Sequence, residues 1–96
     1  MELLVTYDVN TEAAAGRRRL RRVAQLCEAY GQRVQKSVFE CVLNPGQLVE
    51  FRHRVLQIID QSEDNLRIYR LREPRTRYLE VYGRPPEFDL RDPLVV

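Results

Sequence analysis

An apolar strand that ends in an acid and leads at once into an arginine-rich helix is the feature that most limits how this chain can fold. The strand pattern covers residues 2–9 and carries a carboxylate at Asp8, and the arginines follow within residues 17–22. Apolar side chains occupy both faces of the expected strand, which is typical of a strand with neighbours on both sides. We therefore expect residues 2–9 to form the central strand of a sheet.

The next third of the chain predicts one helix and a hairpin. Apolar residues three and four apart favour a helix over residues 13–30, which Asn10 and Thr11 would cap. The expected buried stripe of this helix consists of Leu20, Val23, Ala24, Cys27 and Tyr30. Residues 32–43 then predict two short strands with a bend near residues 36–37.

The second half repeats the alternation of helix and strand. Asn44 followed by Pro45 indicates the start of a second helix, which would continue to about Asp60. Its expected buried face consists of Leu48, Val49, Val55, Leu56 and Ile59. Residues 66–71 alternate as a fourth strand, and residues 78–82 favour a short fifth strand.

The order of these elements is β-α-β-β-α-β with one extra strand, which predicts a ferredoxin-like α+β fold over residues 1–82. Two helices would cover one face of the sheet and leave the other face bare. Because that bare face carries apolar side chains, a second copy of the chain is its simplest cover, and we expect a homodimer.

Residues 83–96 are expected to be an extended C-terminal arm, because they contain three prolines. The arm ends in Leu94, Val95 and Val96. Such an apolar end could add as a strand to another sheet edge, in a second copy or in a partner, or it could be a frayed tail.

The charge of the chain is nearly balanced but its basic residues are lopsided. The chain has 96 residues, enough for one domain, and a formal net charge of +2. Fifteen of its basic residues are arginine, against the single lysine Lys36. Codon bias in the genome explains such a ratio, phosphate recognition by planar guanidinium groups also explains it, and both can be true.

Cysteine usage and hydropathy indicate a cytoplasmic protein. Cys27 and Cys41 lack metal-ligand spacing and fall inside apolar elements, which favours buried free thiols in a reducing compartment. No apolar run is long enough for a signal peptide or a membrane span.

Asp8 is the strongest candidate for a catalytic and metal-binding residue. Phosphodiester hydrolysis with a hard cation such as Mg²⁺ requires oxygen ligands and a polarised water. One carboxylate per chain is a poor magnesium site, but two carboxylates brought together across a dimer axis are a plausible one. The alternative is an ordinary aspartate that ends a strand or caps a helix.

Three arginines are candidates for nucleic-acid binding, namely Arg17, Arg19 and Arg33. Each could neutralise a phosphate, although a solvated helix face is the usual fate of such a charge run. Neighbouring Arg18, Arg21 and Arg22 are expected to be plain surface residues or to form ion pairs.

Three further side chains are candidates for lining the site. Tyr7 and Phe39 could stack on a base, although packing in the core is the simpler explanation. Ser37 could contact phosphate or water, or serve only as a turn residue. His53 lies between two arginines without a partner acid at ligand spacing, so we expect a surface histidine.

With these motifs in place, the chain resembles the small CRISPR-associated adaptation proteins of the "Cas-two" family, the partners of the spacer integrase. The resemblance rests on Tyr-Asp-Val at 7–9, Arg-Arg-Arg-Leu-Arg-Arg-Val at 17–23 and the long segment at 30–41, and it covers residues 1 to about 82. It implies a homodimeric ferredoxin-like fold, a place in spacer acquisition and, for some members, a metal-dependent nuclease. It also implies that Asp8 is the metal-binding acid.

Two mechanisms fit this resemblance. In one, the protein is a metal-dependent endonuclease that uses Asp8. In the other, it is a non-catalytic dimer that bridges integrase subunits and grips duplex DNA with its arginines. A small nuclease toxin of related fold is a third possibility, and the sequence does not separate RNA from DNA as the substrate.

Overall fold

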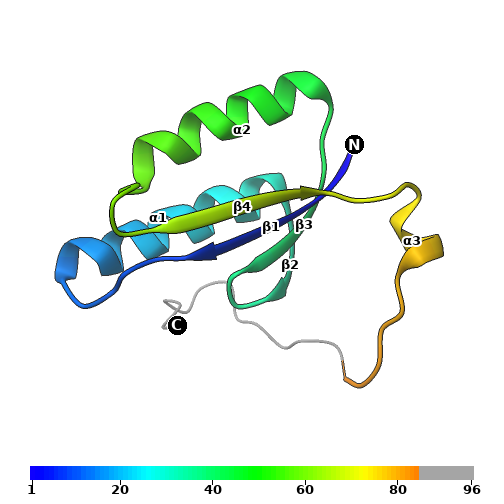
Figure 1. Ribbon diagram of the computed structural model, residues 1–96, viewed down its shortest axis with the longest axis horizontal. Helices are drawn as coiled ribbons and strands as arrows, with labels where there is room; N and C mark the ends of the chain where they lie inside the picture. Colours follow the sequence, from blue (N-terminus) through cyan, green and yellow to red (C-terminus); the bar gives the residue numbers. More distant parts are fainter. Residues whose placement is uncertain (85–96) are drawn as a thin grey trace.

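The computed structural model describes residues 1–84 and shows a four-stranded antiparallel sheet with two long helices and one short one (Figure 1). The elements in chain order are β1 Glu2–Asp8, α1 Ala14–Tyr30, β2 Gly31–Gln35, β3 Val38–Val42, α2 Pro45–Ile58, β4 Asn65–Arg70 and α3 Arg75–Tyr78. The sheet has the strand order β2-β3-β1-β4. The α+β fold and its β-α-β-β-α-β core are confirmed.

Strand β1 lies in the interior of the sheet, as its two-sided apolar pattern predicted. It pairs with β3 on one side and with β4 on the other, both antiparallel. Leu3, Val5 and Tyr7 point into the core, while Leu4 and Thr6 on the opposite face are only half-buried. The period of two residues therefore fixed which side of β1 the helices would cover.

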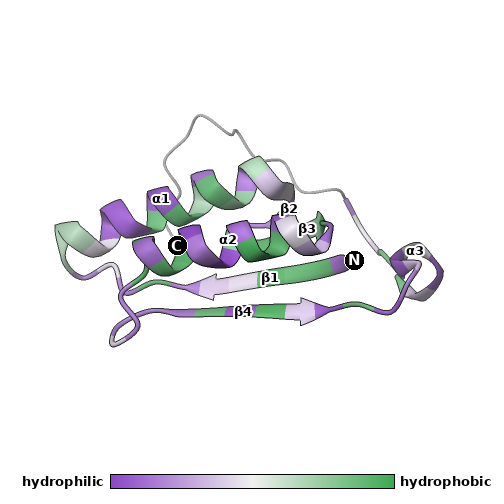
Figure 2. Ribbon diagram, turned by 90° about the horizontal axis from the view of Figure 1, so that it is seen from above, coloured by the Kyte–Doolittle hydropathy of each residue, from purple (hydrophilic) through white to green (hydrophobic). Residues whose placement is uncertain are grey.

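Helices α1 and α2 lie together on one face of the sheet (Figure 2). The stripe predicted for α1 is buried, apart from the half-buried Tyr30. The face predicted for α2 was partly wrong, because Val49 and Leu56 are more than half exposed and Phe51 is buried instead. The ring of Phe51 meets that of Tyr30 edge-on at 5.3 Å, so α2 turns its aromatic side chain towards α1.

The two long helices begin differently. Asn44 caps α2 through a reciprocal pair of bonds with Gln47, at 2.8 and 2.9 Å, as the sequence predicted in part. The caps predicted for α1 were wrong, because Ala13 occupies that position without a side-chain bond. The Oδ1 atom of Asn10 instead accepts the N–H of Glu12 at 3.0 Å, in a turn that ends before the helix starts.

The hairpin predicted within residues 32–43 is present, with its turn between β2 and β3. Gly31 begins β2 directly at the end of α1. A Cβ atom at this position would lie 2.4 Å from the sulfur of Cys41 and 2.5 Å from the carbonyl oxygen of Glu40. Only glycine lets β2 approach β3 this closely, because any side chain would push the two strands apart.

The expected fifth strand at residues 78–82 is not formed in the described part of the chain. Arg75–Tyr78 form the short helix α3, and no described strand pairs with residues 79–82. Ion pairs from Arg75 to Glu2 and Glu40 hold α3 against one end of the open sheet face. A strand needs a neighbour to pair with, and this segment has none among residues 1–84. The predicted arm lies largely outside the described residues.

Both cysteines are buried free thiols, as predicted. Burial raises the pKa of Cys27 to about 12 and that of Cys41 to about 11, so both stay protonated near neutral pH. No helix among residues 1–84 has the length and apolar character needed to cross a membrane.

Candidate active site at the end of strand β1

Asp8 is the last residue of β1 and lies on the open face of the sheet. It is exposed, and its antiparallel neighbour on β4 is Asn65. Among residues 1–84 the structure has no hydrogen bond or ion pair to the Asp8 carboxylate. An exposed carboxylate without an internal partner is free to bind a cation from solution.

The loop that follows Asp8 is held in place through Asn10. The backbone N–H of Asn10 donates to Oδ1 of Asp64 at 3.1 Å. Its carbonyl oxygen lies so close to Gly16 that a Cβ atom there would be 1.8 Å away. The loop therefore packs directly on the backbone of α1, and Gly16 makes that approach possible.

Arg17 lies on the surface beside this loop. Its Nη1 atom donates to the carbonyl oxygens of Thr11 and Glu12 at 3.1 and 3.3 Å. Carbonyl groups carry no net charge, so the guanidinium keeps its positive charge uncompensated by these two bonds. Arg17 thus lies beside the loop that follows Asp8, with a charge that a phosphate could meet.

Arg19, in contrast to Arg17, forms ion pairs with two acids. Its Nε and Nη2 atoms donate to the two oxygens of Asp64 at 2.8 and 3.1 Å, and Nη2 also lies 3.3 Å from Glu63. The Arg19 side chain is 16% exposed and that of Asp64 is fully buried. This two-point contact neutralises the charge of Arg19 within the protein.

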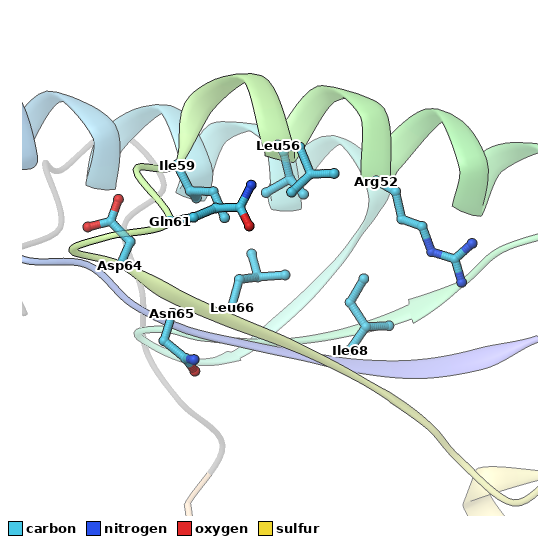
Figure 3. A pocket seen from close by; sticks show the side chains of 9 residues that line it. Arg52, Leu56, Ile59, Gln61, Asp64, Asn65, Leu66 and Ile68 are labelled. Carbon is cyan, nitrogen blue, oxygen red and sulfur yellow. The ribbon is translucent and has the colours of Figure 1, made fainter.

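Asp64 receives two backbone bonds in addition, from Asn10 at 3.1 Å and from Asp60 at 2.9 Å. Figure 3 shows its side chain pointing from the start of β4 towards the helices, whereas that of Asn65 points to the opposite side. Burial raises the pKa of Asp64, but the bonds from Arg19 and from the two backbone N–H groups outweigh it, and the pKa lies below its ordinary value.

Arg33 lies in the core and not on the surface. Its side chain is 2% exposed, its Nη2 atom is 3.0 Å from the Glu28 carboxylate, and its guanidinium sits 4.9 Å from the centre of the Phe39 ring. Direct contact with a phosphate requires a surface that this side chain does not have in the structure. Its geometry instead supports α1 against the β2–β3 hairpin.

The three expected site-lining residues sit behind Asp8 on the helix side of the sheet or in the adjoining turn. The rings of Tyr7 and Phe39 stack at 6.2 Å, and both residues are buried. The Tyr7 hydroxyl donates to the carbonyl oxygen of Lys36 at 3.3 Å, while the Ser37 carbonyl accepts the N–H of Tyr7. Burial raises the pKa of Tyr7 to about 12, against the opposing influence of Arg33. These contacts tie the hairpin turn to β1.

The structure thus brings Asp8 and Arg17 to one end of the sheet and places Arg19 and Arg33 in internal ion pairs. His53 is exposed and bonds only to Gln57 within the described chain, as expected for a surface histidine. Among residues 1–84 no cluster of three or more metal-ligand side chains exists. Sequence reasoning missed Asp64, which lies in a polar loop without any periodic pattern to mark it.

A hollow lies between α2 and β4 at the same end of the molecule. Its volume is about 390 Å³, and its apolar wall is formed by Val55, Leu56, Ile59, Leu66 and Ile68 (Figure 3). Leu56, which forms part of this wall, is 53% exposed, and α2 packs against α1. Asp64 closes one end of this hollow.

Comparison with known proteins agrees with this geometry. The family model of CRISPR associated protein Cas2 matches residues 1–78. A protein from Moorella thermoacetica named CRISPR-associated endoribonuclease Cas2 1 is 55% identical over the full length of both chains. The CRISPR-associated endonuclease Cas2 of Halalkalibacterium halodurans is 46% identical over 99% of each chain.

A solved structure shows the same fold. The crystal structure of Streptococcus pyogenes Cas2 at pH 6.5 superposes with a TM-score of 0.78 and 55% sequence identity, covering 86% of this chain and all of that one. With a family model over most of the chain and relatives that align from end to end, this chain belongs to the Cas2 family of CRISPR-associated proteins.

Proposed function

We propose that this protein is a divalent-metal-dependent endonuclease of a CRISPR system and that it works as a homodimer with Asp8 at the reacting phosphodiester. The observation that carries the proposal is the exposed, unpartnered carboxylate of Asp8 at the end of the central strand. Relatives named endonuclease or endoribonuclease support the reaction class. RNA and DNA are both open as substrates.

The donor set at Asp8 fits magnesium under one condition. Mg²⁺ is commonly held by one or two carboxylates, with water and phosphate oxygens as its other ligands. Among residues 1–84 no group of three or more His, Cys, Asp or Glu side chains could hold a metal ion, so a pair of chains would be needed to bring two Asp8 carboxylates together. When bound there, the cation would polarise the attacking water and offset charge on the phosphate.

The open face of the sheet supports the dimer. On that face Val42 is 62% exposed and Tyr69 is 45% exposed, while Leu4 is half-buried. A second copy laid against this face would cover these side chains. The second copy would also place its own Asp8 in the interface that contains the first Asp8.

The arginines divide the work of binding. Arg17 beside the loop, together with the exposed Arg18, Arg21 and Arg22 of α1, supplies positive charge for the phosphate backbone. Arg19 and Arg33 act within the protein, through Asp64 and Glu28. Tyr7, Ser37 and Phe39 hold the strand end and the hairpin turn that adjoins it.

The test is a cleavage assay on labelled RNA and on duplex DNA with Mg²⁺. Wild-type protein is expected to cut at least one of them, and EDTA or Asp8→Asn is expected to stop the cutting while the dimer mass stays unchanged. Glu12→Gln is the matched control, since Glu12 is an exposed acid in the adjoining loop. Cutting that survives in Asp8→Asn would show that the reaction occurs elsewhere.

A second candidate function is a structural role in spacer acquisition, in which the dimer bridges integrase subunits and grips duplex DNA. The exposed arginines along α1 favour it, because they need no reacting group nearby. Spacer acquisition in cells separates the two. The structural role predicts that cells with Asp8→Asn still acquire spacers, and the nuclease role predicts that they do not.

The compartment is also part of the proposal. We infer a cytoplasmic setting, as expected of a protein that handles nucleic acid inside the cell. The free thiols Cys27 and Cys41 support this, because a reducing environment keeps such groups unpaired.

A further inference from the structure

Building on the proposed function, we propose that Asp64 is the positioning residue for Asp8. In this arrangement Asp64 and Arg19 form a clamp that fixes the end of β1 and so sets where the reacting carboxylate lies. Asp64 itself is too deeply buried to touch nucleic acid or a cation.

The clamp joins three separate parts of the chain at one carboxylate. Oδ1 of Asp64 accepts from Asn10 N–H and from Arg19 Nη2, both at 3.1 Å. Oδ2 accepts from Arg19 Nε at 2.8 Å and from Asp60 N–H at 2.9 Å. The loop after β1, helix α1 and the turn before β4 are therefore held together by one buried side chain.

The clamp acts on Asp8 through the backbone. Asn10 follows Asp8 by two residues. Its backbone N–H donates a hydrogen bond to Asp64, and its carbonyl oxygen packs against Gly16. Since the peptide groups before and after Asn10 are both held, the chain has little freedom at the end of β1. The direction in which the Asp8 side chain leaves the strand is set accordingly.

Asp8 depends on this support because it lacks any of its own. Among the described residues no side chain bonds to its carboxylate, in contrast to buried acids that are oriented by several donors. Two carboxylates can bind one cation only if each is held close to the required coordination geometry. Groups that orient such acids from behind commonly change metal affinity or activity by about 10–100-fold when they are removed.

The clamp also gives Arg19 a role other than phosphate binding. A guanidinium that is already paired at two points with a buried carboxylate would have to give up that pair to meet a phosphate. The two roles make different predictions for Arg19→Ala. If Arg19 serves the clamp, Arg19→Ala resembles Asp64→Ala and leaves nucleic-acid binding unchanged. If Arg19 binds phosphate, Arg19→Ala weakens binding and Asp64→Ala does not.

The experiment compares Asp64→Ala, Asp64→Asn and Arg19→Ala with wild type, and uses Glu63→Gln as the control. Glu63 is the neighbouring acid that also meets Arg19, but it is half exposed and bonds to no backbone N–H in the described chain. Asp64→Asn keeps the shape and one acceptor oxygen, so it serves if Asp64→Ala does not fold. All measurements are made well below the melting temperature of each variant.

The first readout is amide hydrogen exchange, which does not depend on activity. The Asn10 amide is expected to exchange about tenfold faster or more in Asp64→Ala, while amides in the centre of β1 and β3 change little. Unchanged exchange at Asn10 would overturn the clamp. This result stands whether or not the wild-type protein turns out to be a nuclease.

The second readout is cleavage as a function of Mg²⁺ concentration, with binding to RNA and duplex DNA measured separately in EDTA. We expect Asp64→Ala and Arg19→Ala to need about tenfold more Mg²⁺ for half-maximal cleavage, with partial rescue at high Mg²⁺ and unchanged binding in EDTA. Weaker binding in Arg19→Ala alone would overturn the clamp and return Arg19 to phosphate contact. A wild-type protein that cuts nothing would refute the proposed function, with the exchange data still deciding the clamp.

Discussion

Two aspartates stand at the same end of the sheet and differ in almost every physical respect. Asp8 is the last residue of β1 and lies on the open face, where it is exposed. Its carboxylate has no hydrogen bond or ion pair in the described chain. Asp64 lies just before β4 on the helix side, where its side chain is fully buried and accepts four hydrogen bonds. The difference teaches that the surroundings of an acid, and not its type, decide whether it can react or must hold the fold.

The two aspartates differ because their side chains lie on opposite faces of the sheet. Side chains alternate along a strand, so Asp64 points to the helices while Asn65 points away (Figure 3). Asp8 is the cross-strand partner of Asn65 and therefore lies on the same open face. The helix side offers backbone N–H groups and Arg19. On the open side no residue of the described chain bonds to the Asp8 carboxylate, and in our proposal a second chain lies there.

The largest effect that would sharpen this comparison is expected at Asp8. Asp8→Ala should lower cleavage at least a hundredfold, beyond the roughly tenfold loss common for a supporting residue. Its unfolding free energy should stay within about 0.5 kcal/mol of wild type, because an exposed side chain without partners contributes little to stability. Cleavage rates and urea melts on the same preparation check both. A large loss of stability would mean that Asp8 has a structural contact after all.

Asp64→Ala should show the reverse pattern in stability. Removing this carboxylate leaves two backbone N–H groups without acceptors, which should cost about 2–3 kcal/mol of unfolding free energy. Urea denaturation measures this directly. A cost as small as that of Asp8→Ala would break the comparison, because the two acids would then be energetically alike.

The pH dependence of stability should report Asp64 as well. Its pKa is lower in the folded protein than the ordinary value of 3.8, so its contribution is complete above about pH 4 and is lost as the pH falls through the lower folded value. Asp64→Asn cannot titrate at this position and should lose less stability than wild type below about pH 4. The test is to measure the unfolding free energy of wild type and Asp64→Asn as the pH is lowered. The same dependence on pH in both proteins would contradict the prediction.

Replacing Arg17 and replacing Arg19 should have different effects on the salt dependence of DNA binding. Arg17→Ala should flatten the plot of log affinity against log salt by about 0.9 for duplex DNA, because one phosphate contact is lost. Arg19→Ala should leave the slope unchanged, since its charge is already met by Asp64. Equal slopes in the two variants would remove this distinction between the arginines.

The smallest effect is expected at Glu63, the exposed neighbour of Asp64. Its contact with Arg19 is long, at 3.3 Å, and half of its side chain is exposed to solvent. Glu63→Gln should therefore change the unfolding free energy by no more than about 0.5 kcal/mol. A loss approaching that of Asp64→Ala would mean that Arg19 depends on both acids.

Much of the fold was open to prediction because strands and caps have local signatures. The two-residue period of β1 and the Asn44-Pro45 start of α2 each point to one structure. The start of α1 did not, because Asn10 could cap a helix or close a turn, and packing against Gly16 selected the turn. The rotation of α2 depended on Phe51 meeting Tyr30, a contact between distant residues.

The candidate site was predictable only in part, for the same reason. Asp8 stood out because it ends an apolar strand. Arg19 and Arg33 looked like Arg17 in the sequence, and only the positions of Asp64 and Glu28 distinguish them. An acid in a polar loop gives no sign of being buried, since its burial depends on which helix the loop meets.

The central claim is that two Asp8 residues from two chains serve one site. It is tested most directly with a mixed dimer that contains one wild-type chain and one Asp8→Asn chain, isolated through different affinity tags on the two chains. A shared site predicts that the mixed dimer cuts no better than the Asp8→Asn dimer, because each cation needs both carboxylates. A mixed dimer that retains about half of the wild-type rate would show that each chain works alone, and would contradict the account.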